Sequence, residues 1–343
     1  MKPLVSVFIP AYNLPDYTKK TIQSIFDQSY RPLEVLLLDD CSPINLEYIY
    51  LEFKKEFQYD DNIEIKYIRN IVNLGHDNHV LGFDLSKGKY VINMPHDDWF
   101  LYNDFIKESV ELMELNEDCN LCAANSIVEY TDYKMIKLPN NISNPLSWNI
   151  LNGDEYIKIL GMKGIGYQAW SGLIFNKKNA EILGTYHYPF SISIEMGKEL
   201  DIIPDEFFAF QFLLSSIGSI AISEKIVSVR GNPKTSFVNS RKNEWAKSIG
   251  LTSFIIHYNL YKANLTGKFS KTVKKEAIKR IFHFPMNRIS FKIFKFYKYS
   301  LVVLIFMSLA YLFSFFKIFH VLKGKIRNSV KILLKKYKIW EKK

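Results

Sequence analysis

The sequence predicts an α/β fold in which helices cover both faces of a mostly parallel central sheet. Short apolar runs alternate with helical patterns through the first 130 residues, an order typical of parallel strands linked by helices. The runs at 33–38 and 90–94 are nearly continuous in apolar residues, as expected of strands buried on both faces. The composition agrees, since 48% of the 343 residues are hydrophobic and 23% are charged. This length allows one large domain or two ordinary ones.

The first part of the chain is predicted to alternate strands with helices. We expect strands at 5–9, 33–38, 63–68 and 90–94, and helices at 16–28, 46–57 and, after a polar loop at 73–78, up to residue 87. Asp16 is a residue type that caps helix N-termini, and Gly88 is typical of a helix C-terminus.

The second part is less regular. We expect a helix at 104–116, a strand at 121–130, an irregular excursion at 134–149, a strand at 171–175, a helix at 207–215, short strands at 220–222 and 226–229, and a helix at 244–257. Cys119 and Cys122 spell a CxxC pair without a second pair, which favours buried thiols over a zinc site. Three cysteines in all give no reason to expect a disulfide framework.

The charge is divided between an acidic body and a basic tail. The net charge is +10, but residues 267–343 hold about 20 Lys and Arg and two acids, which leaves about −8 on the rest. The tail contains an uncharged apolar stretch at 299–316, at the short end of the roughly 17–25 residues that span a bilayer. These features predict membrane association, by a span or an interfacial helix, with a buried core helix as the alternative. Nucleic acid is not expected as a partner, because the tail is too apolar for phosphate contacts alone.

Polar and acidic residues gather where three of the predicted strands end. Pro10, Tyr12 and Asn13 end the first strand, Asp39–Asp40 the second and Asp97–Asp98 the fourth. In open α/β sheets the ligand crevice lies outside the carboxyl ends of the strands, so these residues should meet in space. Adjacent carboxylates repel each other unless a cation, donors or water compensate. The pattern predicts a site for Mg²⁺ or Mn²⁺, with solvated turns as the plainer alternative.

The ordered set of motifs resembles the family-2 glycosyltransferases, which are inverting enzymes of the GT-A fold. The segments that carry the resemblance are VSVFIPAYN (5–13), VLLLDDCSP (35–43), NLGHDNHVLGFDLSKGKYV (73–91), VINMPHDDWF (91–100), WSGLIFNKK (170–178) and DEFFAFQFLLSSIGSIAISEKIVSVRGNPKTS (205–236). The resemblance implies a GT-A domain at 1–240, with a nucleotide-sugar-binding half at 1–130 and an acceptor-side half at 131–240. The remaining residues, 241–343, would form a helical, basic, membrane-associating tail.

The resemblance also implies roles for residues that match the nucleotide-binding motifs. Tyr12 would stack on the base, with Pro10 beside it. Asp40 would accept a hydrogen bond from the base ring, and Asp39 would support its loop. The other nucleotide-binding residues that the matched loops imply are Asn13 and Asn73.

At the metal site, the resemblance implies that Asp98 ligates Mn²⁺ or Mg²⁺ and that Asp97 contacts ribose or sugar. The family often has a further Asp where Pro95 and His96 stand, and His96 is either a further member of the site or a turn residue. Arg230 matches a Tyr-Arg segment of the family and would pair with phosphate or form a surface salt bridge.

An inverting displacement needs a base to deprotonate the acceptor hydroxyl. The family supplies it from an acidic pair at the head of a late helix, where this chain has Asp205 and Glu206. The apolar phase of the helix favours Asp205, and a shift by one position makes Glu206 the base. Asp205 also suits a helix N-cap, and Glu195 is a third candidate.

Together, the resemblance and the tail predict a metal-dependent, non-processive glycosyltransferase at the cytoplasmic face of the cell membrane. It would move a sugar from a nucleotide diphosphate, with a UDP-sugar favoured, to a glycan or polyprenyl-linked acceptor in cell-surface polysaccharide synthesis. A processive synthase would need several spans and a Gln-x-x-Arg-Trp block, which the sequence does not contain. The alternative from a different class is a non-catalytic sugar-nucleotide-binding or membrane-scaffold protein.

Overall fold

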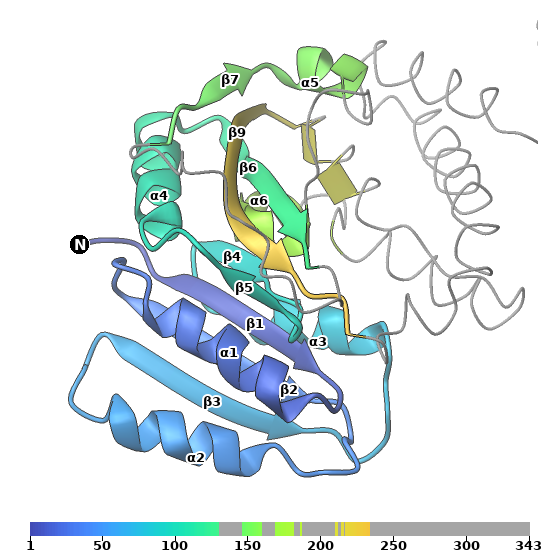
Figure 1. Cartoon of the computed structure of the whole chain (residues 1–343). Helices are drawn as coiled ribbons and strands as arrows, with labels where there is room; N and C mark the ends of the chain where they lie inside the picture. The colour runs from blue at the N-terminus through green and yellow to red at the C-terminus, as the bar shows by residue number, and fades with distance from the viewer. Residues whose placement is uncertain are drawn as a thin grey trace, which may run out of the picture.

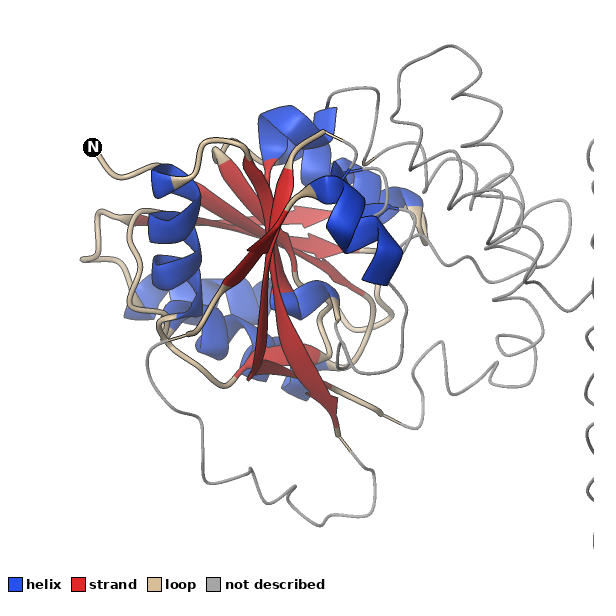
Figure 2. Ribbon diagram, turned by 90° about the horizontal axis from the view of Figure 1, so that it is seen from above, coloured by secondary structure: helices blue, strands red, loops and turns tan. Residues whose placement is uncertain are grey.

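A twisted sheet lies at the centre of the molecule, with helices on both of its faces (Figures 1 and 2). The computed structural model describes residues 1–129, 146–159, 169–181, 186, 210–211, 214–215 and 217–233. Within these residues the predicted α/β architecture is confirmed. The predicted helix at 244–257, most of the one at 207–215 and the tail at 241–343 lie outside them, and the proposed division into domains stays a prediction.

The described elements follow the predicted order closely. The strands are β1 (Val5–Ala11), β2 (Leu33–Asp39), β3 (Ile63–Arg69), β4 (Tyr90–Asn93), β5 (Asp98–Phe100), β6 (Cys119–Val128), β7 (Asn149–Leu151), β8 (Leu173–Asn176) and β9 (Ser219–Arg230). The helices are α1 (Pro15–Phe26), α2 (Glu47–Glu56), α3 (Asp77–Leu85), α4 (Phe105–Leu115), α5 (Gly153–Ile159), the 3-10 helix η1 (Trp170–Gly172) and α6 (Lys177–Glu181).

The sheet is parallel in its first half and mixed in its second. Strands β3, β2, β1 and β4 are neighbours in that order, and all of these pairs are parallel. Beyond β4, β8 is antiparallel to β4 and β6, β6 runs parallel to β9, and β5 and β7 pair antiparallel with β9. The carboxyl ends of the first four strands therefore open at one edge of the sheet.

Both faces of β1 are buried, which explains its continuous apolar sequence. Val5, Val7 and Ile9 pack in one core cluster with Ile22 and Ile25 of α1. The opposite face holds Phe8, which packs against α3. The α3 helix lies close at this point because Gly82 has no side chain: a Cβ there would lie 2.4 Å from Phe8 Cδ2. Residues on alternate faces thus fix a helix on each side of the sheet.

Two sequence predictions near the site edge are wrong in detail. The α1 helix begins at Pro15 and its N-cap position is Leu14, not Asp16, because proline suits the first helical turn and Leu14 turns the chain with φ 55°. Asp16 lies in the first turn instead. The plainer alternative of a solvated turn at Asp97–Asp98 does not hold for Asp98, which is buried, pairs with β9 and begins β5.

A third prediction, of two separate strands at 220–222 and 226–229, is also wrong. They form the single strand β9, which is paired with β6 along its length. The register between the two strands shifts around Asn125, so a bulge accommodates the polar residues that suggested a break.

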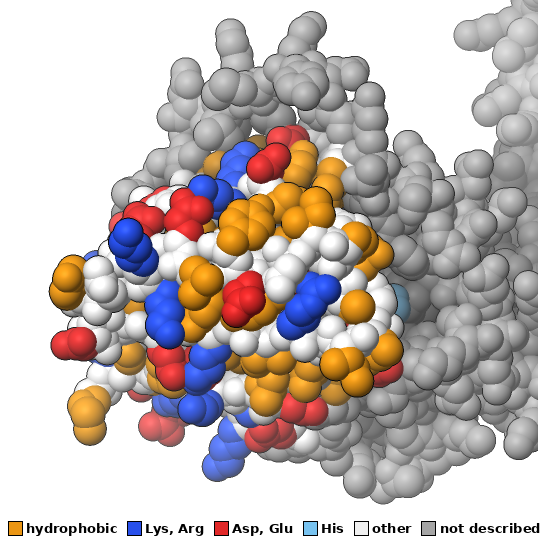
Figure 3. Space-filling model, turned by 90° about the horizontal axis from the view of Figure 1, so that it is seen from below, with side chains coloured by type: hydrophobic (Ala, Val, Ile, Leu, Met, Phe, Trp, Pro, Cys, Tyr) orange, Lys and Arg blue, Asp and Glu red, His pale blue; other side chains and the backbone are white. Residues whose placement is uncertain are grey.

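The surface over α2 carries charges of both signs among hydrophobic side chains (Figure 3). Ile44, Tyr48 and Leu51 are more than half exposed there, at 58%, 51% and 54%. No helix in the described part of the chain is long and apolar enough to cross a membrane. The apolar stretch at 299–316 lies outside that part, and membrane association stays a prediction.

Candidate functional site

The loops that follow β1, β2 and β4 lie against one another at the carboxyl edge of the sheet. The backbone N–H of Asp40 donates to the carbonyl of Ala11 at 2.8 Å. The Nδ1 atom of His96 lies 3.1 Å from the carbonyl oxygen of Pro10. The three polar clusters found in the sequence are thus brought to one edge, where open α/β sheets bind ligands.

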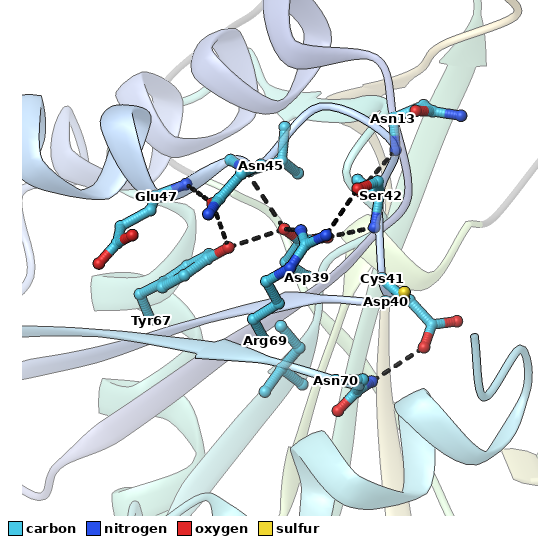
Figure 4. Close-up of polar contacts among 12 residues, drawn as sticks. Asn13, Asp39, Asp40, Cys41, Ser42, Asn45, Glu47, Tyr67, Arg69 and Asn70 are labelled. Atoms are coloured by element: carbon cyan, nitrogen blue, oxygen red, sulfur yellow. Dashed lines mark hydrogen bonds and ion pairs between the residues drawn. The ribbon is translucent and has the colours of Figure 1, made fainter. Parts of the chain in front are cut away.

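Asp39 is a fully buried carboxylate that organises the β2–α2 loop (Figure 4). It accepts hydrogen bonds from the N–H groups of Ser42 at 2.8 Å and Leu46 at 3.3 Å. It also accepts a bond from the Tyr67 hydroxyl at 2.7 Å and pairs with the guanidinium of Arg69. Burial alone would raise the pKa of Asp39, but the bonds led by those from Ser42 and Tyr67 outweigh it and hold the pKa below its usual value. The loop-supporting role fits this geometry.

Asp40 holds the β3–α3 loop. One carboxylate oxygen accepts the Leu74 N–H at 2.7 Å and the Asn70 side-chain amide at 2.9 Å, and the other accepts the Gly75 N–H at 2.8 Å. The side chain is 4% exposed. The neighbouring Asn73 is exposed, and its side-chain Oδ1 also accepts the Gly75 N–H at 3.0 Å. Base recognition by Asp40 stays a prediction, and it would require a donor to share an oxygen that the loop already uses.

The β1–α1 loop places an aromatic ring at the same edge. Tyr12 is 42% exposed, whereas Pro10 is buried within β1. Asn13 and Leu14 follow with positive φ angles of 58° and 55°. The loop is fastened to its neighbour, since the Asn13 N–H donates to the Ser42 hydroxyl at 2.9 Å. An exposed ring on a fixed loop is available for base stacking, as the sequence predicts for Tyr12.

The Asp97–Asp98 pair is divided by burial. Asp98 is 2% exposed, and its Oδ2 accepts the Ser171 hydroxyl at 2.8 Å. That hydroxyl lies 3.1 Å from Ser228 Oγ, which lies 2.7 Å from Ser126 Oγ, so a buried row of serines ends at the carboxylate. The Asp98 Oδ1 atom is buried and has no hydrogen-bond partner of normal geometry among the described residues. Asp97 is only partly buried.

The surroundings of Asp98 disfavour its charged form. Burial raises the pKa of Asp98 well above its usual value, and the adjacent charge of Asp97 raises it further. The Ser171 hydroxyl, the charge of Arg230 and the backbone N–H of Gly231 lower the Asp98 pKa only in part. Arg230 lies opposite Asp98 in the β5–β9 register. A cation beside the pair would relieve both the desolvation and the repulsion.

A residue of α1 holds the turn that carries the Asp97–Asp98 pair. The Thr21 hydroxyl lies 2.6 Å from the Asp98 carbonyl oxygen and 2.9 Å from that of His96. Gly231 packs against the other side, where a Cβ would lie 1.9 Å from the Asp97 carbonyl oxygen. The position of Asp97 is therefore set by backbone contacts on both sides.

His96 has one defined hydrogen bond. A carbonyl only accepts, so the bond to Pro10 places the ring proton on Nδ1. Its Nε2 atom is buried and has no partner among the described residues. A role of His96 in ligation stays a prediction.

The described residues hold only part of the predicted constellation. Asp205, Glu206 and Glu195, the candidates for the base, lie outside them. No cluster of three or more His, Cys, Asp or Glu suited to a metal occurs within the described ranges. A cation at Asp97–Asp98 would therefore take most of its ligands from diphosphate oxygens and water, as Mg²⁺ commonly does.

Sequence reasoning missed Arg69 and Ser171, which contact the two Asp pairs. Arg69 ends β3 as Asp39 ends β2, and the two residues are register partners. Aligning the ends of the two predicted strands would have placed these opposite charges side by side. No local signal identifies Ser171, which is 73 residues away from Asp98.

The comparisons with known proteins agree with this geometry. Residues 6–176 match the family described as Glycosyl transferase family 2. The chain belongs to glycosyltransferase family 2. Relatives of this family include TuaG of Bacillus subtilis, named for teichuronic acid biosynthesis, which is 30% identical over 33% of this chain and 43% of its own. An uncharacterized glycosyltransferase of Haemophilus influenzae is 28% identical over 82% of this chain and 81% of its own.

Solved structures confirm the GT-A fold of this family-2 chain. Staphylococcus aureus TarS 1–349 aligns with a TM-score of 0.54 at 16% identity, covering 84% of this chain and 74% of TarS 1–349. The mannosyltransferase PcManGT from Pyrobaculum calidifontis aligns with a TM-score of 0.53 at 12% identity, covering 82% and 70%. The aligned part of the chain spans less than half of TuaG.

Proposed function

We propose that this chain is a metal-dependent, inverting glycosyltransferase that moves a sugar from a nucleotide diphosphate to a hydroxyl of a glycan or lipid-linked acceptor. The observation that carries the proposal is the Asp97–Asp98 pair, which lies at the ligand-binding edge with the partly exposed Asp97 beside the buried Asp98. Two neighbours support the donor class, since TarS 1–349 was solved with UDP-GlcNAc and PcManGT with GDP-Man and Mn²⁺. The name of TuaG supports a role in cell-surface polysaccharide synthesis.

The residues present fit Mn²⁺ or Mg²⁺. Asp97 is partly exposed whereas Asp98 is buried and bonded to Ser171, so we assign the direct ligand to Asp97 and the supporting charge to Asp98. This differs from the sequence-based assignment of the ligand to Asp98, and matched variants distinguish the two. When bound, the cation would act as a Lewis acid that stabilises charge on the leaving diphosphate.

The nucleotide would lie along the loops after β1 and β2. Tyr12 offers its exposed ring to the base, and Asp40 offers a carboxylate oxygen to a base N–H. Asn13 and Asn73 border this surface. A UDP-sugar is the donor that we favour.

The acceptor side of the proposal rests on the sequence. Asp205, with Glu206 as the alternative, would remove the proton from the acceptor hydroxyl. The basic, apolar tail would hold the enzyme at the cytoplasmic face of the cell membrane, next to a polyprenyl-linked acceptor.

A transfer assay on the full chain tests this function. UDP-GlcNAc, UDP-glucose, UDP-galactose and GDP-mannose are each supplied with a polyprenyl-linked glycan fraction, and sugar incorporation and nucleoside diphosphate release are measured. We expect transfer from one donor class, loss with EDTA and recovery with Mn²⁺ or Mg²⁺. Asp205→Asn or Glu206→Gln should stop transfer while donor binding survives. Donor binding without transfer to any acceptor would favour the non-catalytic alternative.

A further inference from the structure

Arg69 connects two loops of the candidate nucleotide site. Its Nη1 pairs with the buried Asp39, and its Nη2 donates to the Ser42 carbonyl oxygen at 2.8 Å (Figure 4). The side chain is 32% exposed, whereas that of Asp39 is fully buried. The planar guanidinium thus bridges the end of β2 and the loop that follows it from the neighbouring strand β3.

The bridge continues into the β1–α1 loop. Ser42 donates its N–H to Asp39, and its hydroxyl accepts the N–H of Asn13 at 2.9 Å. Asn13 adjoins Tyr12, the exposed ring of the site. A continuous path of hydrogen bonds therefore runs from Arg69 through Ser42 to the residue next to Tyr12.

The two joined loops hold unusual backbone conformations. Asn13, Leu14 and Cys41 have positive φ angles of 58°, 55° and 60°. Such conformations in residues other than glycine persist only when surrounding contacts enforce them, and they concentrate at ligand-binding sites. The hydrogen bonds of Ser42 and Arg69 supply such contacts to both loops.

We propose that Arg69 is a positioning residue, which acts through Ser42 to hold the β1–α1 and β2–α2 loops in the conformation that binds the nucleotide. This inference rests on the proposed function, because it concerns the same nucleotide site. Both terminal nitrogens of Arg69 are engaged, by Asp39 and Ser42, and the proposed role needs no contact between Arg69 and the nucleotide. Lysine cannot replace it, since a single ammonium does not reproduce the two-pronged geometry.

The test is a double-mutant cycle with Arg69→Lys and Ser42→Ala, read by calorimetric titration with UDP in the presence of Mn²⁺. Each single variant should weaken UDP binding about tenfold, and the double variant should be no weaker than the poorer single, because both act on one path. The kcat at saturating donor should change less than about threefold, since the reacting groups are untouched.

Arg31→Lys is the matched control. Arg31 forms a similar ion pair, with Asp60 at 3.0 Å, in the connection that leads into β2 at the opposite edge of the sheet. Arg31→Lys should lower thermal stability about as much as Arg69→Lys does, and it should leave UDP affinity within about twofold of wild type. Equal losses of UDP affinity in Arg31→Lys and Arg69→Lys would overturn the proposal.

Two further results would also overturn it: additive effects in the cycle, or Arg69→Lys and Ser42→Ala proteins with wild-type UDP affinity. If Arg69→Lys does not fold, Tyr67→Phe is used in its place. It removes one hydrogen-bond donor to Asp39 and leaves the Arg69 bonds to Asp39 and Ser42 in place. It should weaken UDP binding less than Ser42→Ala does. A wild-type protein that binds none of UDP, GDP or dTDP would instead contradict the proposed function, so the two failures are distinguishable.

Discussion

The two Asp pairs at the carboxyl edge have the same sequence and opposite electrostatic environments. Asp39 and Asp40 are both buried, and donors from three loops or strands satisfy them, so the pKa of Asp39 lies below its usual value. Asp98 is equally buried, but it has one unpartnered oxygen among the described residues and a raised pKa. The first pair builds the loops, whereas the described surroundings of Asp98 in the second pair disfavour its charged form.

The difference comes from the neighbouring elements rather than from the pairs themselves. Strand β3 supplies Tyr67 and Arg69 to Asp39. Asp98 accepts the neutral hydroxyl of Ser171 from η1, and Arg230, its register partner on β9, lowers the Asp98 pKa only in part. A carboxylate pair at a strand end is thus a structural or a cation-binding feature according to the donors around it.

The greatest loss of transfer is expected from substitutions at Asp97 and Asp98, and it should differ between the two. Asp97→Asn should reduce transfer by about 10²–10³-fold, because it removes the proposed direct ligand of the cation. Asp98→Asn should reduce it by about tenfold or less, since the amide keeps an acceptor for Ser171. Initial rates at saturating Mn²⁺ measure both. A larger loss of transfer in Asp98→Asn than in Asp97→Asn would show that Asp98 is the direct ligand of the cation.

A moderate loss of UDP affinity is expected from a substitution in the first pair, at Asp40. Asp40→Asn replaces one acceptor oxygen by an N–H₂ group, so at least one of the donors Leu74, Gly75 and Asn70 loses its partner. We expect UDP affinity to fall about tenfold and the amide of Gly75 to exchange faster. Hydrogen exchange and calorimetry measure these, with Asp61→Asn, at an exposed position, as the control. Unchanged exchange at Gly75 would show that Asp40 does not hold the loop.

The smallest effect concerns a third buried carboxylate, at the amino edge of the sheet. Glu34 is fully buried and bonded to the Ser6 hydroxyl, the Lys87 N–H and the Lys66 ammonium. Burial would raise the pKa of Glu34, but these bonds lower it below 4.5.

A lowered pKa in the folded state means that Glu34 stabilises the fold above about pH 4.5, and that this stability is lost as the pH falls through the folded-state pKa. Glu34→Gln should therefore lower the free energy of unfolding at pH 7 and flatten its fall below pH 4.5. Urea unfolding at several pH values between 7 and 3 measures this free energy. An unchanged acid slope would contradict the assignment.

Much of the fold follows from the sequence because apolar runs determine buried parallel strands. The runs that became β1, β2 and β4 are nearly continuous, whereas β3 alternates apolar and charged residues. The helix expected up to residue 87 ends earlier, at Leu85, with Ser86 and not Gly88 at its C-cap. The pairing of β5 with β9 could not be predicted, because Asp98–Phe100 is too short to show a period and its partner lies beyond residue 218. The bulge in β9 likewise depends on β6, not on local composition.

The candidate site was predictable in its residue types and only partly in their roles. Strand ends place Asp39, Asp40, Asp97 and Asp98 at one edge, as the sequence suggests. Which carboxylate is buried depends on Ser171 and β9, which come together with it only in the folded chain. The sequence could therefore identify the pair and could not distinguish the exposed member.

The decisive experiment for a diphosphate–metal site at Asp97–Asp98 is calorimetric titration with UDP, with and without Mn²⁺, on wild type, Asp97→Asn and Arg31→Lys. We expect UDP to bind wild type and Arg31→Lys more tightly when Mn²⁺ is present, and Asp97→Asn to lose this difference while remaining folded. Binding of UDP that is equally tight with and without Mn²⁺ in all three proteins would contradict a diphosphate–metal site at Asp97–Asp98.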